Sequence, residues 1–429
     1  MANNKTALAL DYYSQFSCIG GACEDSCCIG WRVDIDKRTY KKYKENQHKV
    51  LAPLFKSAVK RNDSSSTPDC YGVISLDPEG KCSFLDQDKL CKIQKTMGPE
   101  ALSPVCTNYP RTAYRLGEQF EYSLGLSCPE VARLVLLKRE PLQFIEVSRM
   151  QSLEGSGSLI RQNWERGEDS PAKLPLIYDL RALIIGILQH REIHIDARLM
   201  MLGLLLEATD KSVGAGFEKL EENLPGVLAE YAGMLAHAGI IQTELDKVEP
   251  DYSLKLSVLG DIVSALMPKI IKGRFRECLE EAVDGLSFKT ENPKSDSDIV
   301  AHLREVNASI CVPFFEANPN ILENYLVDYV FRTVFPLKYK SLLLHFREMV
   351  CNYLILKFLL LGMAAFHKKI NDDLVVKLFQ SFNRVSAHNS SYMATIISSL
   401  EARNLGDFRS LIVLLLDGVE PDSANPFPK

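Results

Sequence analysis

The sequence predicts a mainly α-helical fold: an irregular, cysteine-rich metal-binding domain with short strands, followed by a large helical domain. Two observations support this prediction. Of the twelve cysteines in 429 residues, nine lie within the first 128. Beyond residue 171, apolar residues recur at three- and four-residue spacing, which is typical of helices. A hydrophobic content of 46% and a charged content of 24% are ordinary for a globular protein.

Changes in this pattern define three predicted regions. Residues 1–130 are expected to form the cysteine-rich domain with short hairpins, residues 131–170 a helical connector, and residues 171–429 the helical domain. The best linker candidate is the polar stretch "RGEDSPAKLP" that spans the second boundary. A second polar stretch at 284–298 could subdivide the helical domain.

Short strands alternate with helices in the first third of the chain. "WRVDID" at 31–36 reads as a strand, and the stretch at 37–61 reads as one helix. "DPEG" supplies the proline and glycine of a tight turn, so 71–86 is predicted to be a hairpin. Alternating apolar residues at 113–128 predict a second hairpin. Pro129 then stands at a favourable first-turn position for a helix.

Long helices are predicted in the remainder, over 176–190, 196–210 and 341–370. Asp372 or Asp373 is expected to cap the helix that follows. The most apolar window, Tyr353–Phe366, is shorter than a typical membrane span and contains Lys357. We therefore interpret it as a buried helix and expect no membrane span.

Charge and the N-terminal sequence bear on partners and location. The net charge of −5 gives no electrostatic basis for binding nucleic acid. The N-terminal stretch "MANNKTALALDYYSQF" lacks the apolar core of a signal peptide, so a cytoplasmic location is expected. In that reducing compartment, a dense group of cysteines is typical of metal binding or catalysis rather than of disulfides.

Eight N-terminal cysteines form two groups suited to a thiolate metal site. Thiolates are soft ligands for iron–sulfur clusters, zinc or copper(I), and four of them normally close one site. The spacing is irregular and the C-x2-C knuckles of zinc ribbons are absent, which favours an iron–sulfur cluster. Sequence leaves open which four bind. The candidate metal ligands are Cys18, Cys23, Cys27 and Cys28 in one group, and Cys82, Cys91, Cys106 and Cys128 in the other.

The adjacent pair Cys27–Cys28 argues against a disulfide knot. Neighbouring Cα atoms lie about 3.8 Å apart, whereas unstrained disulfides need roughly 4.4–6.8 Å. The two thiols also tend to point apart, which favours a metal facing only one of them. Cys70 lies beside a polar loop, and its sequence context is equally consistent with core packing and with metal binding. The remaining cysteines are predicted to pack in the helical core: Cys278, Cys311 and Cys351.

Segments that contain these cysteines resemble the bacterial flagellin lysine-N-methylase family. "FSCIGGACEDSCCIGWRVDIDKRTYKKY" and "CSFLDQDKLCKIQKTMGPEALSPVCTNYPR" are similar to its N-terminal signature, and "LENYLVDYVFRTVFP" and "FNRVSAHNSSY" to its C-terminal helical region. The resemblance implies methyl transfer from S-adenosylmethionine to the ε-amines of flagellin lysines. It also implies a [4Fe-4S] cluster bound by N-terminal cysteines, which would make residues 1–130 an iron–sulfur domain.

Familiar donor-binding motifs do not locate the S-adenosylmethionine site. "EGSGSL" at 154–159 lies between helix-like segments, not after a strand as a Rossmann turn would. Cys23-x3-Cys27 has the first spacing of a C-x3-C-x2-C radical loop, but Gly30 occupies the third position. The donor therefore binds in an unfamiliar pocket, or the cluster contributes in an unusual way.

Sequence assigns no catalytic base. Tyr109 and Arg111 follow Cys106 closely, although turn scaffolding is the favoured role for both. His388 is interpreted as a structural histidine, and two further polar positions as helix packing residues: Asn324 and Tyr325.

Two classes of function remain at this stage. In the first, the cysteine domain supports methyl transfer while the helical half binds flagellin. In the second, the protein is a non-enzymatic iron–sulfur or zinc-binding scaffold that binds a partner. Binding of S-adenosylmethionine separates the two.

Overall fold

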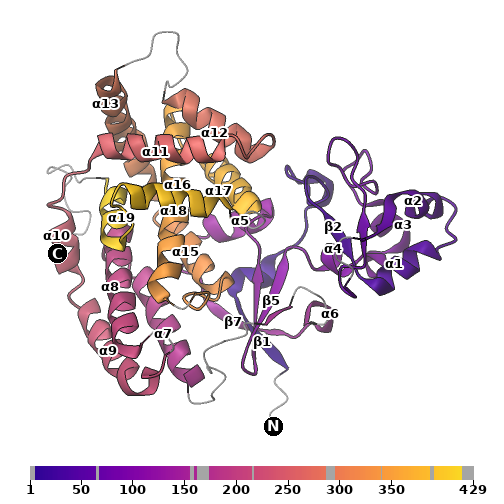
Figure 1. Cartoon of the computed structure of the whole chain (residues 1–429), viewed down its shortest axis with the longest axis horizontal. Coiled ribbons are helices and arrows are strands. Elements are labelled where there is room, and N and C mark those ends of the chain that lie inside the picture. The colour runs from indigo at the N-terminus through magenta and orange to yellow at the C-terminus, as the bar shows by residue number, and fades with distance from the viewer. Residues whose placement is uncertain are drawn as a thin grey trace. The chain divides into compact units, whose positions relative to one another are not determined.

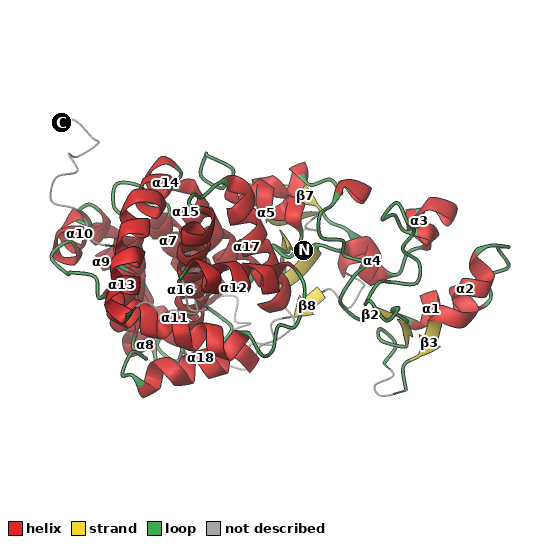
Figure 2. Ribbon diagram, turned by 90° about the horizontal axis from the view of Figure 1, so that it is seen from above, coloured by secondary structure: helices red, strands yellow, loops and turns green. Residues whose placement is uncertain are grey.

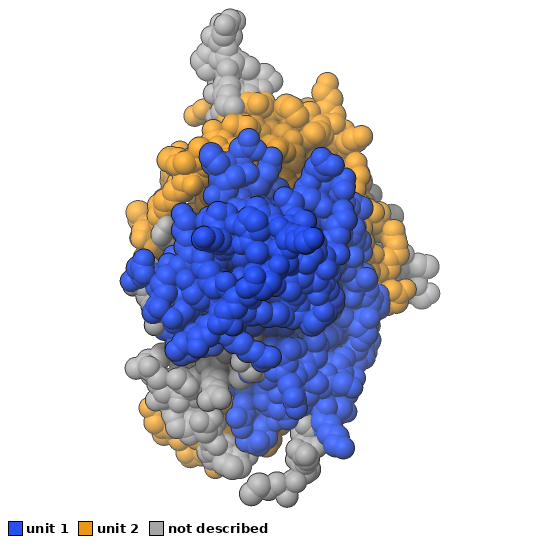
Figure 3. All heavy atoms as spheres, turned by 90° about the vertical axis from the view of Figure 1, so that its right-hand side faces the viewer, with its two compact units in different colours: residues 1–134, 143–163 blue, residues 135–142, 164–429 orange. Residues whose placement is uncertain are grey.

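A computed structural model describes the fold over residues 5–63, 67–154, 159–161, 173–214, 217–286, 295–339, 341–386 and 391–417 (Figure 1). The chain divides into two compact units, coloured separately in Figure 3. Unit 1 comprises Met1–Leu134 and Gln143–Asn163, and unit 2 comprises Val135–Leu142 and Trp164–Lys429. Every strand of the described chain belongs to unit 1 (Figure 2), and the fold is mainly helical as predicted.

A five-stranded sheet forms one part of unit 1, with the order β7-β1-β6-β5-β8. The predicted hairpin at 113–128 is confirmed, because β5 and β6 pair in antiparallel register from Arg111↔Leu124 to Leu116↔Gln119. Its turn contains Gly117 at a φ of 57°, a conformation that glycine adopts without strain. The strands are β1 (Thr6–Leu10), β5 (Arg111–Leu116), β6 (Gln119–Leu124), β7 (Phe144–Ser148) and β8 (Leu159–Arg161).

A three-stranded sheet forms the other part, with the order β2-β4-β3. The predicted strand within 31–36 is confirmed as β2 (Val33–Ile35), which pairs with β4 (Gly72–Ile74). The "DPEG" turn is also confirmed, because Gly80 N–H donates to the Asp77 carbonyl at 2.9 Å. The strand β3 (Val59–Arg61) completes this sheet.

The single helix predicted at 37–61 is wrong. The segment folds as α1 (Lys37–Lys44) and α2 (Leu51–Ala58), followed by β3. The break has a local cause. The Asn46 side chain accepts a hydrogen bond from the backbone N–H of His48 at 2.9 Å, and this bond replaces a helical one at that position. The two helices then bury Tyr43 against Phe55, with ring centroids 4.4 Å apart.

Short helices join the strands of unit 1, both within the five-stranded sheet and between the two sheets. The helix predicted from Pro129 begins there, but it ends at Leu136. The prediction of a helical connector at 131–170 is wrong at residues 144–148. These residues form β7, which pairs with β1 through five residue pairs. The helical segments of this region are η1 (Asp11–Gln15), η2 (Gly20–Ala22), α3 (Lys92–Met97), η3 (Pro99–Ala101), α4 (Pro104–Asn108), α5 (Pro129–Leu136) and α6 (Gln151–Glu154).

Unit 2 is helical throughout its described residues, as predicted, and most of its helices pack around α16. Close packing of α12 against α16 needs glycine, because a Cβ on Gly285 would lie 2.1 Å from the Gly362 carbonyl oxygen. The helices are α7 (Lys173–Leu188), α8 (Ile195–Val213), α9 (Leu220–Leu235), α10 (Gly239–Leu245), α11 (Tyr252–Leu266), α12 (Arg274–Gly285), α13 (Asp296–Val306), the π-helix η4 (Asn307–Cys311), α14 (Val312–Ala317), α15 (Asn320–Arg332), α16 (Leu342–His367), α17 (Asp372–Ser386), α18 (Ser391–Ala402) and α19 (Phe408–Leu415).

Among the described helices, α16 is long and apolar enough to cross a membrane. However, 89% of its most apolar window is buried inside the protein, which is typical of a core helix. The buried helix predicted at 353–366 is therefore confirmed. The three core cysteines are also confirmed, since Cys278, Cys311 and Cys351 are all buried.

The N-terminal cap of α17 differs from the prediction. The Asn371 Oδ1 atom accepts a hydrogen bond from the Leu374 backbone N–H at 3.0 Å. Asn371 therefore caps the helix, whereas the sequence predicted Asp372 or Asp373 as the cap. Asparagine caps as well as aspartate, and it stands one residue before the helix begins. Several predicted features lie outside the described residues: His388, most of the linker at 166–175, and the centres of the stretches at 154–159 and 284–298.

A buried histidine lies on α16 without solvent contact. His345 is 0% exposed and stands 4.8 Å from the Phe335 ring and 5.7 Å from the Tyr339 ring. Burial lowers the pKa of this imidazole to about 4, while Glu348 acts in the opposite direction and Lys338 in the same direction. The folded protein therefore holds His345 neutral where the unfolded chain would bind a proton.

We expect unit 2 to lose stability as pH falls. As pH falls, His345 of the unfolded chain binds a proton near pH 6.5, whereas His345 of the folded protein does so only near pH 4. The stability that the neutral, buried imidazole contributes is therefore complete above pH 6.5 and is lost progressively towards about pH 4. The expected loss is about 3 kcal/mol. The loss is measured by comparing how the free energy of unfolding changes between pH 7 and 4 in wild type and in His345→Phe. The control is a substitution at an exposed histidine, His237→Gln. Equal pH dependence in all three proteins would contradict the expectation.

Candidate functional site

Four of the eight candidate thiols converge in unit 1 from different segments of the chain. Cys27, Cys91 and Cys106 all lie within electrostatic range of the Cys82 thiol, and Cys106 lies within range of Cys27 and Cys91. We call Cys27, Cys82, Cys91 and Cys106 the four-thiol group. Cys82 is buried, Cys91 is half-buried, and the other two residues are exposed. The group therefore reaches solvent on one side.

Backbone pairing brings these segments together. The Cys82 N–H donates to the Cys28 carbonyl at 2.8 Å, which places Cys82 beside the Cys27–Cys28 pair. An isolated antiparallel bridge joins Leu85 to Cys91, so the chain after Cys82 returns to it before α3 begins. These contacts are local in space but join residues up to 54 positions apart.

The helix that contains Cys106 is held next to Cys27 by aromatic packing. Trp31 donates its indole N–H to the Cys27 carbonyl at 2.6 Å. The same indole packs edge-on against Tyr109, with ring centroids 5.0 Å apart, at the end of α4. The Tyr109 hydroxyl lies 3.2 Å from Ser127 Oγ. Tyr109 is therefore both near the thiols and part of the scaffold that positions them.

The pKa of Cys82 shows what the four-thiol group requires. Burial raises the pKa of this thiol to about 11, and the neighbouring thiols of Cys106, Cys91 and Cys27 raise it further. Four thiolates this close repel one another, so they deprotonate together only when a cation compensates their charge. In a metal-bound state the cation supplies that compensation, and binding releases protons.

Cys28 belongs to a different environment from its neighbour Cys27. Its side chain packs against the hydrophobic core of the three-stranded sheet, as Cys91 does, and Cys82 is part of that core. Cys28 is not among the thiols that affect Cys106. The expectation that the two adjacent thiols point apart agrees with this arrangement.

The other three candidates gather where α5 begins. Cys128 is buried, and burial raises its pKa to about 11, with further contributions from Cys23 and Cys18. An ion pair between Glu24 and Arg133 joins the loop of Cys23 to α5. We call Cys18, Cys23 and Cys128 the three-thiol group. It adjoins the four-thiol group because Cys27 also affects Cys23.

The loop that contains Cys18 and Cys23 depends on glycine. Gly20 has a φ of 57°, and a Cβ on Gly21 would lie 2.6 Å from the Asp88 carbonyl oxygen. The pair "GG" therefore permits the loop to lie against residues 88–90. Sequence analysis did not identify this requirement, although the two glycines between the cysteines were a visible signal.

The arrangement does not match a site for a single ion. In residues 5–63 and 67–154, as in the other described parts, no three histidine, cysteine or acidic side chains lie close enough to hold one metal ion. An iron–sulfur cluster makes a different demand, since each thiolate binds a separate iron and the thiolates stand farther apart. Four cysteines from separate segments are the type of donor set that such a cluster uses.

Comparison with known proteins identifies the family. The FliB lysine N-methylase C-terminal domain matches residues 181–414. This match covers more than half of the chain. The chain belongs to the FliB lysine N-methylase family. Proteins called lysine-N-methylase from Salmonella typhimurium and Salmonella choleraesuis are each 28% identical over 424 residues, covering 94% of this chain and 97% of the relative.

A further relative matches a shorter stretch of the chain. A flagellar biosynthetic protein, FliU, from Salmonella muenchen is 37% identical over 129 residues, which is 29% of this chain and 73% of that protein. No solved structure matches the chain. The predicted family membership is therefore confirmed.

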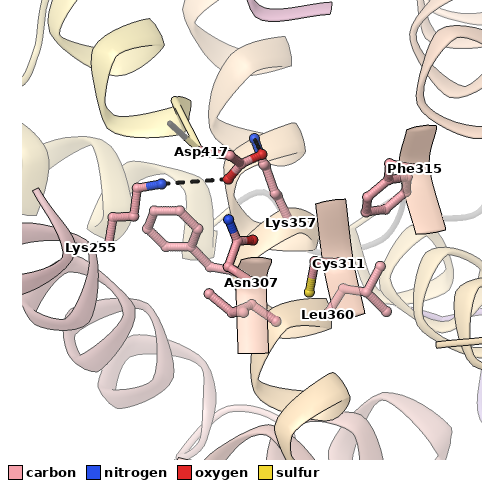
Figure 4. A pocket seen from close by; sticks show the side chains of 9 residues that line it. Lys255, Asn307, Cys311, Phe315, Lys357, Leu360 and Asp417 are labelled. Atoms are coloured by element: carbon pink, nitrogen blue, oxygen red, sulfur yellow. Dashed lines mark ion pairs between the residues drawn. The ribbon is translucent and has the colours of Figure 1, made fainter. Parts of the chain in front are cut away.

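Unit 2 contains a buried polar centre (Figure 4), which joins two lysines of the matched region to residues just after it. Lys357 Nζ lies 2.7 Å from an Asp417 carboxylate oxygen and donates to the Leu415 carbonyl. Lys255 Nζ lies 3.6 Å from the other Asp417 oxygen and donates to the Leu416 carbonyl. Two buried amines thus hold the end of α19. Burial lowers the pKa of Lys255 to about 8, and Asp417 opposes this shift.

The cavity beside this centre is small. It is lined by Asn307, Cys311 and Phe315 together with the two lysines, and its volume is about 10 Å³. A cavity of this size holds one water molecule. We therefore interpret the polar centre as an anchor for the C-terminal helix. Sequence analysis noted Lys357 as an interruption of the apolar window but did not identify its partners.

The remaining sequence candidates have structural contacts. The Asn324 amide donates to the carbonyls of Val135 at 2.9 Å and Lys138 at 2.6 Å. Tyr325 packs edge-on against Phe379 at 5.1 Å. The packing role predicted for both residues is confirmed. Arg111 lies over the Phe16 ring at 5.1 Å, at the start of β5.

Proposed function

We propose that this protein transfers methyl groups from S-adenosylmethionine to lysine ε-amines of flagellin in the cytoplasm, supported by a [4Fe-4S] cluster bound by cysteines of unit 1. The observation that carries the proposal is the relationship to proteins named lysine-N-methylase, which extends over 94% of the chain. The name of the FliU relative, a flagellar biosynthetic protein, supports a flagellar substrate.

The four-thiol group is the proposed ligand set. Cys27, Cys82, Cys91 and Cys106 would each bind one iron, and the cluster would supply a redox-active centre. The chain around it holds the ligands in place through three contacts: the bridge at Cys91, the Cys82–Cys28 hydrogen bond and the Trp31–Tyr109 contact. These contacts pre-organise the thiols for cluster binding.

The reaction requires a neutral lysine. A protonated amine with a pKa of about 10.4 is not a nucleophile, so the proton must leave before the amine attacks the methyl group. A sulfonium beside the amine lowers the amine pKa by charge repulsion. The amine nitrogen then forms a bond to the methyl carbon, the carbon–sulfur bond breaks, and the second proton of the amine passes to solvent. We assign no catalytic base.

Anaerobic protein should be brown, contain iron and inorganic sulfide in equal amounts, and add methyl groups to flagellin lysines when S-adenosylmethionine is present. Intact-mass spectrometry of flagellin measures methylation, and metal analysis measures the cluster. Stoichiometric zinc without sulfide would reject the cluster. Unmodified flagellin with fully metallated enzyme would reject the proposed reaction.

The alternative is a non-enzymatic metal-binding scaffold. It predicts no binding of S-adenosylmethionine by the intact metallated protein, whereas the proposed function requires it. Equilibrium dialysis with the labelled donor separates the two hypotheses without depending on the choice of protein substrate.

A further inference from the structure

A cleft in unit 2 shares no lining residue with the cavity of Figure 4 and has no role in the function described above. It is formed where three helical segments meet: the C-terminal ends of α12 and α16, and the junction of α13 with η4. Its volume is about 400 Å³. The residues that define its chemistry are Asp284, His302, Glu305, Ile310, Phe366 and Lys368.

One wall of the cleft is apolar. The Phe366 side chain is 46% exposed, although the residues beside it, Ala365 and Val306, are buried. Large aromatic residues are seldom left this exposed without a reason, and a ring at the wall of a cleft can cover the hydrocarbon part of a ligand. Ile310 extends the same wall and is half-buried.

The charge of the cleft favours a cation. The helices α12 and α16 both end here, at Gly285 and His367, so the partially negative ends of two helix dipoles meet. Asp284 and Glu305 add two carboxylates, and Lys368 adds one positive charge at the edge. The residues lining the cleft therefore carry a net negative charge.

Glu305 differs from the other acidic residues of this region. On α12, the carboxylates of Glu277 and Glu281 pair with Lys377, and Glu281 also contacts His367. Among the residues that the structure describes, the Glu305 carboxylate has no ion-pair partner, and it is exposed to solvent. A positive group entering the cleft would find this carboxylate available.

We propose that this cleft binds a lysine side chain of the protein substrate, with its methylenes on Phe366 and its ammonium near Glu305. A lysine side chain combines the two required properties, an apolar stem and a charged end. The inference rests on the proposed function and adds a docking site on unit 2 to it. Docking raises the local concentration of substrate without taking part in the transfer.

The expected effects are moderate, since exposed charges contribute little individually. We expect the single substitutions Glu305→Gln and Phe366→Ala each to raise the Kd for flagellin about two- to fivefold. The double variant with Asp284→Asn and Glu305→Gln should raise this Kd about tenfold. The matched controls are Glu221→Gln with Glu222→Gln on α9, and the exposed Phe144→Ala on β7, which should leave the Kd unchanged. The value of kcat should be unchanged and KM should rise.

Acetylated flagellin provides a second measurement. Acetylation removes the lysine charge, so it should weaken binding to wild type and have little further effect on the doubly neutralised variant. Wild-type Kd values in the variants, or equal sensitivity to acetylation, would overturn the inference. If a neutralised variant fails to fold, the exposed charge reversal Glu305→Lys takes its place. Wild type that neither binds nor methylates flagellin would instead refute the proposed function, and the docking site with it.

Discussion

Cys27→Ala should abolish cluster binding and methyl transfer, whereas Cys28→Ala, one residue away, should keep both. Cys27 lies within range of Cys82 and Cys106, so its loss removes one of the four proposed ligands. Cys28 packs against the core of the three-stranded sheet. Removing its sulfur costs about 1 kcal/mol of packing energy and no ligand.

The two variants form a matched pair because they delete the same atoms from adjacent positions. Iron and sulfide content after anaerobic reconstitution is the primary measurement, and flagellin methylation is the second. We expect Cys27→Ala to retain at most about a tenth of the wild-type iron, because the loss of a mere outer-shell partner already lowers metal affinity roughly 10–100-fold and a missing ligand costs more. A metal-free Cys28→Ala, or a fully loaded Cys27→Ala, would reverse the assignment of the two thiols.

Glu323→Gln should strongly destabilise unit 2. Glu323 on α15 is completely buried and accepts hydrogen bonds from Arg191 at 2.8 and 2.9 Å and from Arg198 at 3.0 Å. Arg198 is itself buried. Burial lowers the pKa of its guanidinium, and Glu323 opposes that shift. Without the carboxylate, a buried positive charge has lost its principal counter-ion.

The expected loss is about 3–5 kcal/mol, which is typical when one partner of a buried ion pair is removed. The corresponding fall in Tm is on the order of 10 °C for a unit of this size. The control is Glu244→Gln, which breaks the exposed Glu244–Lys247 pair and should change stability by less than about 1 kcal/mol. Thermal denaturation followed by circular dichroism compares the two. A Glu323→Gln protein as stable as the control would contradict the prediction.

Sequence patterns identified the features that depend on neighbouring residues. The helical periodicity after residue 171, the hairpin at 113–128 and the "DPEG" turn were all predicted and are present. The predictions failed where distant pairing decides the structure. The β-prone run at 144–147 is too short to distinguish a strand from a helix, and β7 forms because β1, more than 130 residues earlier, supplies its hydrogen-bonding partner.

The candidate site divides in the same way. Sequence alone determined that this chain concentrates its thiols in the N-terminal third, that the adjacent pair is unsuited to a disulfide knot, and which family it resembles. Only the tertiary structure separated a four-thiol group from a three-thiol group and placed Cys28 against the core. The direction of a side chain from an irregular loop depends on backbone angles that the loop adopts only when packed. Spacing along the chain, which is all that a sequence displays, does not specify those angles.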